Sequence, residues 1–434
     1  MTGLLKLLPE SAGQDQAGCL IIAGYSLRAL AAKYGTPLYL YDQATLSQQV
    51  QRLNGSLQRN YPGDWQIAYA AKAYFSLGIA RRLAAYGLGV DVVSQGEMAV
   101  ARRAGFLVER IHLHGNNKSV AELSAALDWN VQSIVVDSLD ELDLLESLAE
   151  EKKCVARIWL RISPDVLVDT HSYLQTAHSA SKFGLGIQNG QAGVAIDRAR
   201  MSRWLNLTGL HAHLGSQFRQ PEPYREAIHR LYALADAHHF IPQEISPGGG
   251  WGVSYLPDQA EDNPEPWIST VSVTLQEECV QRGWQLPRLV VEPGRWLVAR
   301  AGAALYTVGA TKTAADGTRF IAVDGGMADN PRPALYDARY TACLPEHMNA
   351  APLHQYSVVG KFCESGDKLI PEVWLPEARR GDLLLIPVAG AYQLSMASNY
   401  NLAPRPAVLW LEPGHVEVLQ RREQPDESGW WLGE

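Results

Sequence analysis

The sequence predicts an α/β protein, with a (β/α)8 TIM-like barrel followed by an all-β C-terminal domain. The 434-residue chain is too long for one ordinary hydrophobic core. Between about residues 45 and 295, roughly eight short apolar runs alternate with longer helical stretches, as in a barrel of this kind. From residue 296 onward the pattern changes to strands and turns. A doubly wound open sheet would alternate in the same way and is kept as the lesser alternative.

The candidate barrel strands are short runs rich in apolar and β-branched residues. In chain order they are WQIAYAAKA, GLGVDVVS, RIHLHG, VQSIVVDS, CVARIWLRIS, LTGLHAHLGS, PQEISPGGG and RLVVEPG. Longer stretches between them, such as GEMAVARRAGF, LDELDLLESLAEEKK and YREAIHRLYALADAHHF, predict helices. We therefore assign residues 45–295 to the barrel.

Strand-like runs after residue 295 predict the second domain, residues 296–434. They are WLVARAGAALYTVGATKT, TRFIAVDGG, QYSVVGKF, DLLLIPVAGAY and PAVLWLEPGHVEVLQ. The N-terminal segment contains two further runs of this kind, CLIIAG and PLYLYD. We expect residues 1–44 to pair with the C-terminal sheet.

Composition and charge exclude several classes of protein. The formal net charge of −8 gives no electrostatic reason to bind nucleic acid or an anionic membrane, and no run approaches the ~18 apolar residues of a membrane span. The five cysteines are scattered without a CxxC pair, which argues against a disulfide scaffold or a zinc site. The first residues, MTGLLKLLPESAGQ, lack the flanks of a signal peptide. We expect a cytoplasmic protein.

In a parallel barrel, the active site lies at the C-terminal ends of the strands. Chemically functional residues gather at the predicted ends in this sequence. They are Lys72, Asp91, Ser94, His114, Asn116, Arg161, His213, Ser216, Gly248, Gly249, Gly250, Glu292 and Arg295. This placement is the main reason, from the residues alone, to expect an active site there.

Lys72 lies in an otherwise apolar and aromatic run, IAYAAKAYF. One interpretation is that it ends the strand and extends its ammonium group into water along its aromatic neighbours. The other is that its amine is partly desolvated, neutral and nucleophilic, as Schiff-base chemistry requires. The residues at the neighbouring strand ends distinguish between these two interpretations of Lys72.

Three further motifs each allow a structural and a functional interpretation. The glycines in PGGGWGVSY either form a tight turn or turn backbone N–H groups toward a single phosphate monoester. In HAHLGS, His211 and His213 lie on one side of a strand without a third ligand at a metal-like spacing, and an imidazole can also lie flat against a planar cofactor ring. In VVEPGR, Glu292 and Arg295 either pair with each other or bind a ring nitrogen and an anion.

These features have one common explanation. A Schiff-base lysine, a carboxylate for a pyridinium nitrogen, a glycine-lined phosphate pocket and a flat imidazole together suit pyridoxal 5′-phosphate (PLP), whose ring is an electron sink for a carbanion. We therefore favour the functional interpretation of Lys72, and we predict no metal.

The sequence resembles the fold type III PLP-dependent decarboxylases, and most closely their diaminopimelate decarboxylase branch. The matching blocks run through nearly the whole chain: YAAKA, GVDVVSQGE, HGNNKS, TAHSASKFGLG, HAHLGSQ, GGGWGVSY, EPGRWLVARAG, VDGGMADNPRPALYDARY, CESGD and GAYQLSMASNYN. Their number and common order make the resemblance specific. Gln95 and Ala177 stand where this family commonly has glycine, and Lys361 where proline is frequent, but none of them replaces a catalytic group.

The resemblance implies PLP as the cofactor and a role for each matching residue. Lys72 is the expected Schiff-base lysine, while His213 is expected to stack on the cofactor ring and Glu292 to pair with its nitrogen. The implied cofactor-binding residues are Lys72, Asp91, Arg161, His213, Ser216, Gly248, Gly249, Gly250, Glu292, Gly294, Arg295 and Tyr392, and the implied substrate-binding residues are Arg295, Arg332, Tyr336, Glu364 and Tyr392. Cys363 is the implied proton donor, which the other subunit of a homodimer with shared active sites supplies.

The residues themselves support two of these roles. Prolines on both sides of Arg332 stiffen its backbone and suit an accurately presented guanidinium, although a surface turn would look the same. Cys363 lies close in sequence to Glu364 and Asp367, and nearby carboxylates favour the protonated form of a thiol. An inert buried cysteine is the alternative for Cys363.

The resemblance implies decarboxylation of meso-2,6-diaminopimelate to L-lysine and CO2. Asp337 lies near the position at which related basic amino acid decarboxylases bind a distal amine, but those enzymes lack an arginine like Arg332, so we expect a distal carboxylate to be selected. The alternatives are a sibling decarboxylase acting on another or a carrier-tethered amino acid, an amino acid racemase, and a non-catalytic homologue. The presence of Lys72, Cys363 and Glu292 together argues against the last of these.

Overall fold

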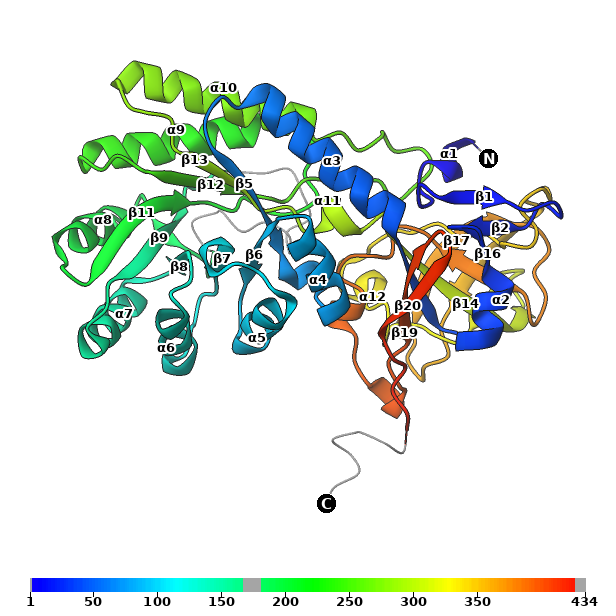
Figure 1. Cartoon of the computed structure of the whole chain (residues 1–434). Helices are drawn as coiled ribbons and strands as arrows, with labels where there is room; N and C mark the ends of the chain where they lie inside the picture. Colours follow the sequence, from blue (N-terminus) through cyan, green and yellow to red (C-terminus); the bar gives the residue numbers. More distant parts are fainter. Residues whose placement is uncertain (1, 167–180, 426–434) are drawn as a thin grey trace. The chain divides into compact units, whose positions relative to one another are not determined.

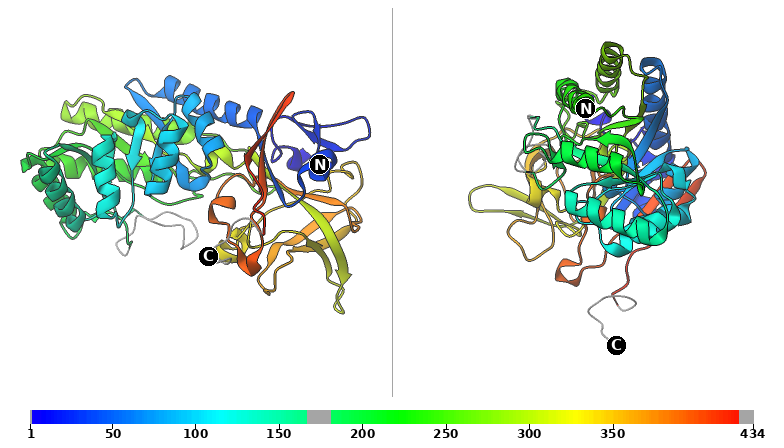
Figure 2. Two further views of the ribbon diagram at one scale, coloured as in Figure 1. Left: turned by 60° about the horizontal axis from the view of Figure 1, so that its bottom comes forward. Right: turned by 90° about the vertical axis from the view of Figure 1, so that its left-hand side faces the viewer.

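The computed structural model describes residues 2–166 and 181–425, which form two compact units (Figures 1 and 2). The barrel unit comprises Val50–Gly252 and Asn263–Gly294, and the sheet unit comprises Met1–Gln49, Val253–Asp262 and Arg295–Glu434. The chain therefore enters and leaves the barrel unit twice. Part of the block TAHSASKFGLG, including Ala177, lies outside the described residues.

Eight parallel strands of the barrel unit, counted over the described residues, close into a ring. They are β5 (Trp65–Ala70), β6 (Gly89–Val92), β7 (Ile111–Leu113), β8 (Ser133–Val136), β9 (Ala156–Ser163), β11 (Leu205–His211), β12 (Glu244–Gly248) and β13 (Arg288–Val291). They pair in the order β9-β11-β12-β13-β5-β6-β7-β8, and β8 pairs with β9 to complete the ring. The short strand β10 (Leu185–Gly186) is an additional parallel partner of β9. Closure confirms the predicted barrel and rules out the open doubly wound sheet.

Helices lie outside the ring, and all of them except α3, which precedes β5, follow a barrel strand (Figure 1). They are α3 (Gln43–Asn60), α4 (Leu77–Ala85), α5 (Gln95–Ala104), α6 (Val120–Trp129), α7 (Leu139–Lys152), α8 (Gln191–Met201), α9 (Glu222–Ala237) and α10 (Glu265–Arg282). Four of them begin at a serine, because the side chains of Ser76, Ser94, Ser119 and Ser138 accept a hydrogen bond from the backbone N–H three residues later. The three helices predicted between the barrel strands, α5, α7 and α9, are confirmed.

Buried polar side chains fill the barrel toward the end at which the strands begin. Glu244, the first residue of β12, accepts hydrogen bonds from Gln132 Nε2 and Trp159 Nε1, both at 2.8 Å. His112 of β7 lies 2.8 Å from Ser133 Oγ, and its ring centroid lies 4.5 Å from that of Trp159. This end of the barrel is therefore packed, which leaves the carboxyl ends of the strands for a ligand.

The sheet unit contains a mixed sheet of eight strands among the described residues. They are β4 (Leu38–Asp42), β14 (Gly302–Thr313), β15 (Arg319–Val323), β16 (His354–Val359), β17 (Lys368–Leu375), β18 (Leu383–Ile386), β19 (Ala407–Glu412) and β20 (His415–Gln420). The order is β17-β16-β15-β14-β4-β19-β20, with β18 paired to β14. Strand β4 lies between β14, to which it is antiparallel, and β19, to which it is parallel.

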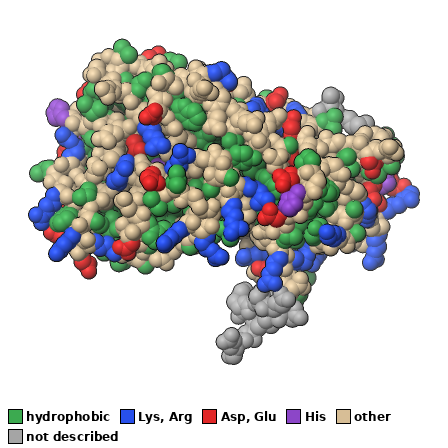
Figure 3. Space-filling model, viewed as in Figure 1, with side chains coloured by type: hydrophobic (Ala, Val, Ile, Leu, Met, Phe, Trp, Pro, Cys, Tyr) green, Lys and Arg blue, Asp and Glu red, His purple; other side chains and the backbone are tan. Residues whose placement is uncertain are grey.

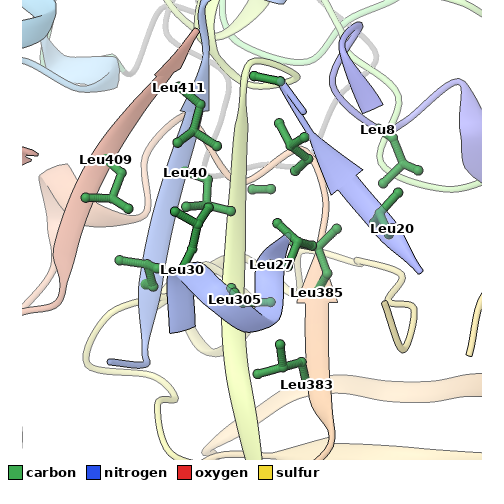
Figure 4. Packing of buried hydrophobic residues seen from close by; sticks show 14 of the residues in the cluster. Leu8, Leu20, Leu27, Leu30, Leu40, Leu305, Leu383, Leu385, Leu409 and Leu411 are labelled. Atoms are coloured by element: carbon green, nitrogen blue, oxygen red, sulfur yellow. The ribbon is translucent and has the colours of Figure 1, made fainter. Parts of the chain in front are cut away.

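The core of the sheet unit joins N-terminal and C-terminal segments of the chain (Figure 4). Its buried leucines include Leu27 of α2 (Leu27–Tyr34), Leu40 of β4, Leu305 of β14 and Leu409 of β19. The N-terminal helix α1 (Thr2–Leu5) and a small antiparallel sheet of β1 (Ala12–Gln14), β2 (Leu20–Ile22) and β3 (Tyr25–Ser26) complete this segment. Burying one leucine contributes about 1.5–3 kcal/mol, so the N-terminal segment is an integral part of this core.

Three elements of the sheet unit differ from the sequence-based expectation. Residues 296–298, expected to open a long strand, lie in the short helix α11 (Arg295–Val298), and β14 begins only at Gly302. Neither α12 (Arg332–Tyr336) nor β17 was expected. A helix of one turn is too short to show a helical period, which is why its apolar residues look like strand.

Charged side chains of both signs are interspersed on the face of the molecule shown in Figure 3. This mixture agrees with the small net charge of −8. Over the described ranges, the helices are too short or too polar to cross a lipid bilayer.

Candidate active site

Lys72 lies directly after the first barrel strand, in the single turn η1 (Ala71–Ala73). The strand ends at Ala70, so Lys72 is not part of a buried strand, and its side chain is exposed rather than partly desolvated as expected. Tyr69 fixes the turn, because its hydroxyl donates to Tyr74 O at 2.7 Å and accepts from Tyr74 N–H at 3.2 Å. The Lys72 amine is therefore accessible at the carboxyl end of the barrel.

Glu292 is a buried carboxylate directly after β13. Ser246 Oγ donates a hydrogen bond to Glu292 Oε1 at 2.6 Å, and His211 Nε2 lies 3.0 Å from Glu292 Oε2. Burial opposes ionisation of Glu292, but His211 beside it and the two hydrogen bonds from His211 and Ser246 hold the pKa of its carboxyl well below the usual value. A negative charge is therefore held in place at the end of this strand.

Asp91 and His114 lie next to this carboxylate. His114 Nε2 is 3.6 Å from Asp91 Oδ1 and 3.8 Å from Glu292 Oε1. Burial and the charge of Glu292 raise the pKa of Asp91 well above its usual value, and burial lowers the pKa of His114. The cluster therefore combines a carboxyl with a raised pKa, Asp91, and one with a lowered pKa, Glu292. Asp91 Oδ1 and His114 Nε2 have no hydrogen-bond partner among the described residues.

His114, His211 and Glu292 form one compact group, with donor atoms that all lie within 4.8 Å of one another. This group was not predicted from the sequence, in which His211 was instead grouped with His213. The other two members of the group are His114, which directly follows β7, and Glu292, which directly follows β13. The hydrogen bond between His211 and Glu292 makes this group part of the network around the carboxylate.

The glycine run after β12 leaves no room for side chains. Gly248 and Gly250 have φ of +80° and +100°, which favour glycine. A Cβ atom at Gly249 would lie 2.1 Å from Glu292 O, and one at Gly250 would lie 2.1 Å from Gly215 O. Close backbone packing thus accounts for these glycines, and their binding of a phosphate group stays a prediction.

His213 lies beside this glycine turn. It follows β11 by two residues and is half-buried, and its Nδ1 atom accepts a hydrogen bond from Gly249 N–H at 3.4 Å. Burial, followed by the charges of Lys72 and Arg161, holds the pKa of His213 well below its usual value. A neutral imidazole therefore lies beside the glycine turn and feels the positive charge of Lys72.

Arg161, Ser216 and Gly294 complete the candidates in the barrel unit. Arg161 lies on β9, 3.7 Å from Asp137 Oδ1, and its guanidinium carbon is 4.4 Å from the centroid of the Phe183 ring. Ser216 is half-buried in the segment after β11. A Cβ atom at Gly294 would lie 3.0 Å from that of Ala73, so this glycine permits close approach to the turn that carries Lys72.

In the sheet unit, Arg295 and Arg332 belong to one buried cluster with three tyrosines. Arg295 Nη1 donates to Tyr255 Oη at 2.9 Å, and the Arg295 guanidinium lies 4.5 Å from the Tyr392 ring centroid. Arg332 Nη1 donates to Tyr340 Oη, and its guanidinium lies 4.8 Å from the Tyr255 ring centroid. Sequence reasoning missed Tyr255 and Tyr340, because a tyrosine in a loop has no local signature.

Tyr336 and Asp337 stand at the end of the same short helix as Arg332. Tyr336 is the last residue of α12 and is half-buried. Asp337 ends the helix in a left-handed conformation with φ of 50°, and its side chain is exposed. Asp337 thus has a local role in ending α12.

Cys363 and Glu364 are exposed in a loop of the sheet unit. Cys363 N–H donates to Asn401 Oδ1 at 3.2 Å. Asp367, expected beside the thiol, is buried and accepts the backbone N–H groups of Phe362 and Met327 at 2.8 and 2.7 Å. Asp367 therefore shapes the loop, while the thiol itself is open to solvent or to another protein chain.

The residues of the barrel unit fit PLP. Glu292 is an ionised carboxylate at a buried position, which suits a protonated ring nitrogen, and Lys72 offers an accessible amine. Asp91 Oδ1 and His114 Nε2 are buried polar atoms without a hydrogen-bond partner among the described residues, as expected where a polar ligand completes a site. Lys72, His213 and Glu292 would hold the cofactor.

Comparison with known proteins defines the class of this protein. A family model for the pyridoxal binding domain of pyridoxal-dependent decarboxylases matches residues 45–299. The chain belongs to the pyridoxal-dependent decarboxylase family.

Within this family, the chain groups with the diaminopimelate decarboxylases. It is 40% identical to the diaminopimelate decarboxylase of Bacillus subtilis, over 94% of both chains. It superposes on the diaminopimelate decarboxylase of M. jannaschii in complex with L-lysine with a TM-score of 0.90, at 30% identity over 98% of this chain and 97% of the other. The Helicobacter pylori enzyme complexed with L-lysine gives a TM-score of 0.83, at 32% identity over 92% and 97% of the two chains.

Proposed function

We propose that the protein removes one carboxylate from meso-2,6-diaminopimelate to give L-lysine and CO2, with PLP as its cofactor. The observation that carries this proposal is the 40% identity to a curated diaminopimelate decarboxylase over 94% of both chains. The buried arginine cluster of the sheet unit supports a substrate with a carboxylate at its far end.

The barrel unit supplies the groups that hold the cofactor. When bound, PLP provides the electron sink that accepts the electron pair left by CO2. Lys72, His213 and the ionised Glu292 would hold the cofactor: Lys72 through its amine, His213 through its imidazole, and Glu292 as the carboxylate that pairs with the ring nitrogen. The further cofactor-binding candidates of the barrel unit are Asp91, Arg161, Ser216, Gly248, Gly249, Gly250 and Gly294, and those of the sheet unit are Arg295 and Tyr392.

The substrate is recognised at its distal end. Arg332 is buried, and among the described residues no carboxylate forms an ion pair with it. Burial disfavours its charge, but Tyr255 and Tyr340 raise the pKa of Arg332, so the guanidinium stays positive. A distal carboxylate would supply the missing anion, and substrates without one would leave this charge unpaired. Arg295, Tyr336, Glu364 and Tyr392 are further substrate contacts.

Cys363 delivers the proton that replaces CO2, acting within a homodimer whose subunits share their active sites. The support for this proposal is the family resemblance of the CESGD block and the exposure of the Cys363 side chain in its loop. We also propose the domain division into 1–44, 45–295 and 296–434, with which the family match at 45–299 agrees. A cytoplasmic location agrees with five cysteines that are all free in the structure.

A substrate panel on purified, PLP-loaded protein tests the proposed function. CO2 release is followed from meso-diaminopimelate, L-lysine, L-ornithine, L-arginine and L-glutamate, for the wild type and for Arg332→Ala. We expect turnover of diaminopimelate alone, and a fall in kcat/KM of at least about 100-fold in the variant, because a buried charge contact is lost. Arg379→Ala is the matched control, since Arg379 is an exposed arginine of the same unit.

Turnover of a basic amino acid instead would contradict the proposal and direct attention to Asp337. No turnover across the panel, in a protein that still binds PLP, would indicate a larger or carrier-bound substrate. The Arg379→Ala control should keep wild-type kinetics, because exposed ion pairs contribute little.

A further inference from the structure

Tyr255 contacts both arginines of the buried cluster. Its hydroxyl oxygen accepts a hydrogen bond from Arg295 Nη1 at 2.9 Å, and its ring centroid lies 4.8 Å from the guanidinium carbon of Arg332. One side chain therefore engages both guanidinium groups, because its hydroxyl oxygen interacts with Arg295 and Arg332 and its ring lies against Arg332. Tyr255 and the two arginines are each no more than 7% exposed.

Two tyrosine rings, those of Tyr255 and Tyr340, lie close to the guanidinium of Arg332. The Tyr340 ring centroid lies 5.5 Å from the guanidinium carbon, and the rings of Tyr255 and Tyr340 meet edge to face at 83° with centroids 5.2 Å apart. A guanidinium has five N–H donors in one plane, and a carboxylate binds to such a fork with two parallel hydrogen bonds. Because Arg332 Nη1 already donates to Tyr340 Oη, a carboxylate would bind through the other N–H donors of this guanidinium.

We propose that Tyr255 is a positioning residue that sets substrate specificity, because it fixes the spacing of Arg295 and Arg332 so that the distal carboxylate of the substrate binds to both. This inference rests on the proposed function and extends it to a residue outside the substrate-binding set named above. Tyr255 acts through the two arginines and does not take part in bond breaking.

The ionisation of Tyr255 agrees with this arrangement. Burial opposes the loss of its proton, but the charges of Arg295 and Arg332 outweigh burial and lower the pKa of Tyr255. The phenol thus lies in the combined positive potential of both cations. A carboxylate that enters the same potential gains a strong, specific attraction.

Tyr255→Phe tests the inference while keeping the ring under Arg332. The variant loses the oxygen that interacts with both guanidinium groups, and hydrogen bonds to charged groups are among the strongest in proteins, so we expect binding of the distal carboxylate to weaken about tenfold or more. KM for meso-diaminopimelate should rise by this factor, with kcat changed less than about threefold.

Two product-like ligands distinguish carboxylate recognition from general damage. L-lysine keeps the distal carboxylate of the substrate, whereas cadaverine has the same amines without it. Binding of both to the PLP-loaded protein is measured by titration calorimetry. In Tyr255→Phe, we expect the Kd of L-lysine to rise about tenfold and that of cadaverine to change less than about twofold.

Tyr306→Phe is the matched control. Tyr306 is another buried tyrosine of the sheet unit, and its hydroxyl donates to Asp329 Oδ2 at 2.6 Å. This control should lose thermal stability through its own hydrogen bond and keep the wild-type ratio of the two dissociation constants. Equal weakening of both ligands in Tyr255→Phe, or unchanged binding of L-lysine, would overturn the inference.

The same data separate failure of the inference from failure of the proposed function. If the wild type turns over diaminopimelate and Tyr255→Phe keeps its KM, the inference alone is wrong. If the wild type does not turn over diaminopimelate but binds L-lysine at least about tenfold more tightly than cadaverine, and Tyr255→Phe loses this preference, the inference holds and the proposed function is wrong. A wild-type protein that does not bind L-lysine more tightly than cadaverine would contradict the inference.

Discussion

His211 Nε2 lies 3.0 Å from Glu292 Oε2, in a pair of side chains that are both almost fully buried. The histidine ends β11 and the carboxylate follows β13, so two barrel strands meet through this contact. Ser246, on the strand between them, donates to the other carboxylate oxygen. Both carboxylate oxygens of Glu292 therefore contact protein side chains, and these contacts fix the orientation of the carboxylate.

Replacement of His211 by alanine should weaken cofactor binding. The variant leaves one oxygen of a buried carboxylate without its donor, which raises the pKa of Glu292 and removes part of the charge that a ring nitrogen requires. We expect the dissociation constant of PLP to rise about tenfold or more, measured by absorbance titration of apoprotein. His238→Ala is the control, because His238 is a less buried histidine that pairs with Asp197 elsewhere on the barrel unit. Wild-type PLP affinity in His211→Ala would contradict this role.

Replacement of Lys72 by alanine should abolish both activity and covalent retention of PLP. We expect kcat to fall by more than about 1,000-fold. After borohydride reduction, mass spectrometry should find PLP on the peptide that contains Lys72 in the wild type and on no peptide in the variant. Lys312→Ala, an exposed lysine at the end of β14, should behave as the wild type. Labelling at another lysine in the wild type would refute the assignment.

Mixing two inactive variants tests whether active sites are shared. Lys72→Ala and Cys363→Ala each remove one proposed group, and a homodimer with shared sites regains one intact site per mixed dimer. Random reassociation of equal amounts should restore about a quarter of wild-type activity. The control is the same mixture without dissociation of the subunits, which should stay inactive. No recovery after verified exchange would show that both groups act within one chain.

Acid should destabilise the barrel unit through His112. Burial, against the opposing charge of Glu292, lowers the pKa of His112 to about 3, whereas an unfolded histidine has a value near 6.5. Below about pH 6.5 the unfolded chain binds a proton that the folded chain does not, so stability present above this pH is lost as pH falls toward 3, by about 1.4 kcal/mol per pH unit for this one group.

Thermal unfolding of His112→Gln between about pH 7.5 and 4.5 measures this contribution. The variant loses the contact with Ser133 and should be less stable than the wild type near neutral pH. Its melting temperature should nevertheless fall less steeply with acid, because the titrating group is gone. A pH dependence as steep as that of the wild type would mean that other buried groups, such as His114 and His213, account for acid sensitivity.

The barrel was predictable because its strands are short apolar runs that end at small or polar residues. VQSIVVDS, for example, contains β8 and also Ser138, the residue that begins α7. The sheet unit was harder to predict in detail. Strand β17 lies at an edge of the sheet and contains Pro371, and a proline inside a short run argues against a strand even though five of its eight residues are apolar.

The candidate site was predictable where a residue follows a strand directly, as Glu292 does. Contacts between such residues were not, because they depend on neighbours in space that are distant in sequence. The contact between His114 and Glu292 joins two strand ends, and Tyr255 meets Arg332 only because segment 253–262 returns to the sheet unit. No local pattern in the sequence encodes either pairing.

The position of β4 between β14 and β19 has a consequence for synthesis of the chain. A ribosome releases β4 early, but its first partner, β14, begins only at Gly302. At typical rates of synthesis, the strand waits about 10–50 s, during which all of the barrel strands emerge. An apolar strand with two open edges is prone to pair wrongly in that time. Newly made chains should therefore depend on chaperones until translation ends, and early termination should yield a folded barrel that carries an aggregation-prone N-terminal arm.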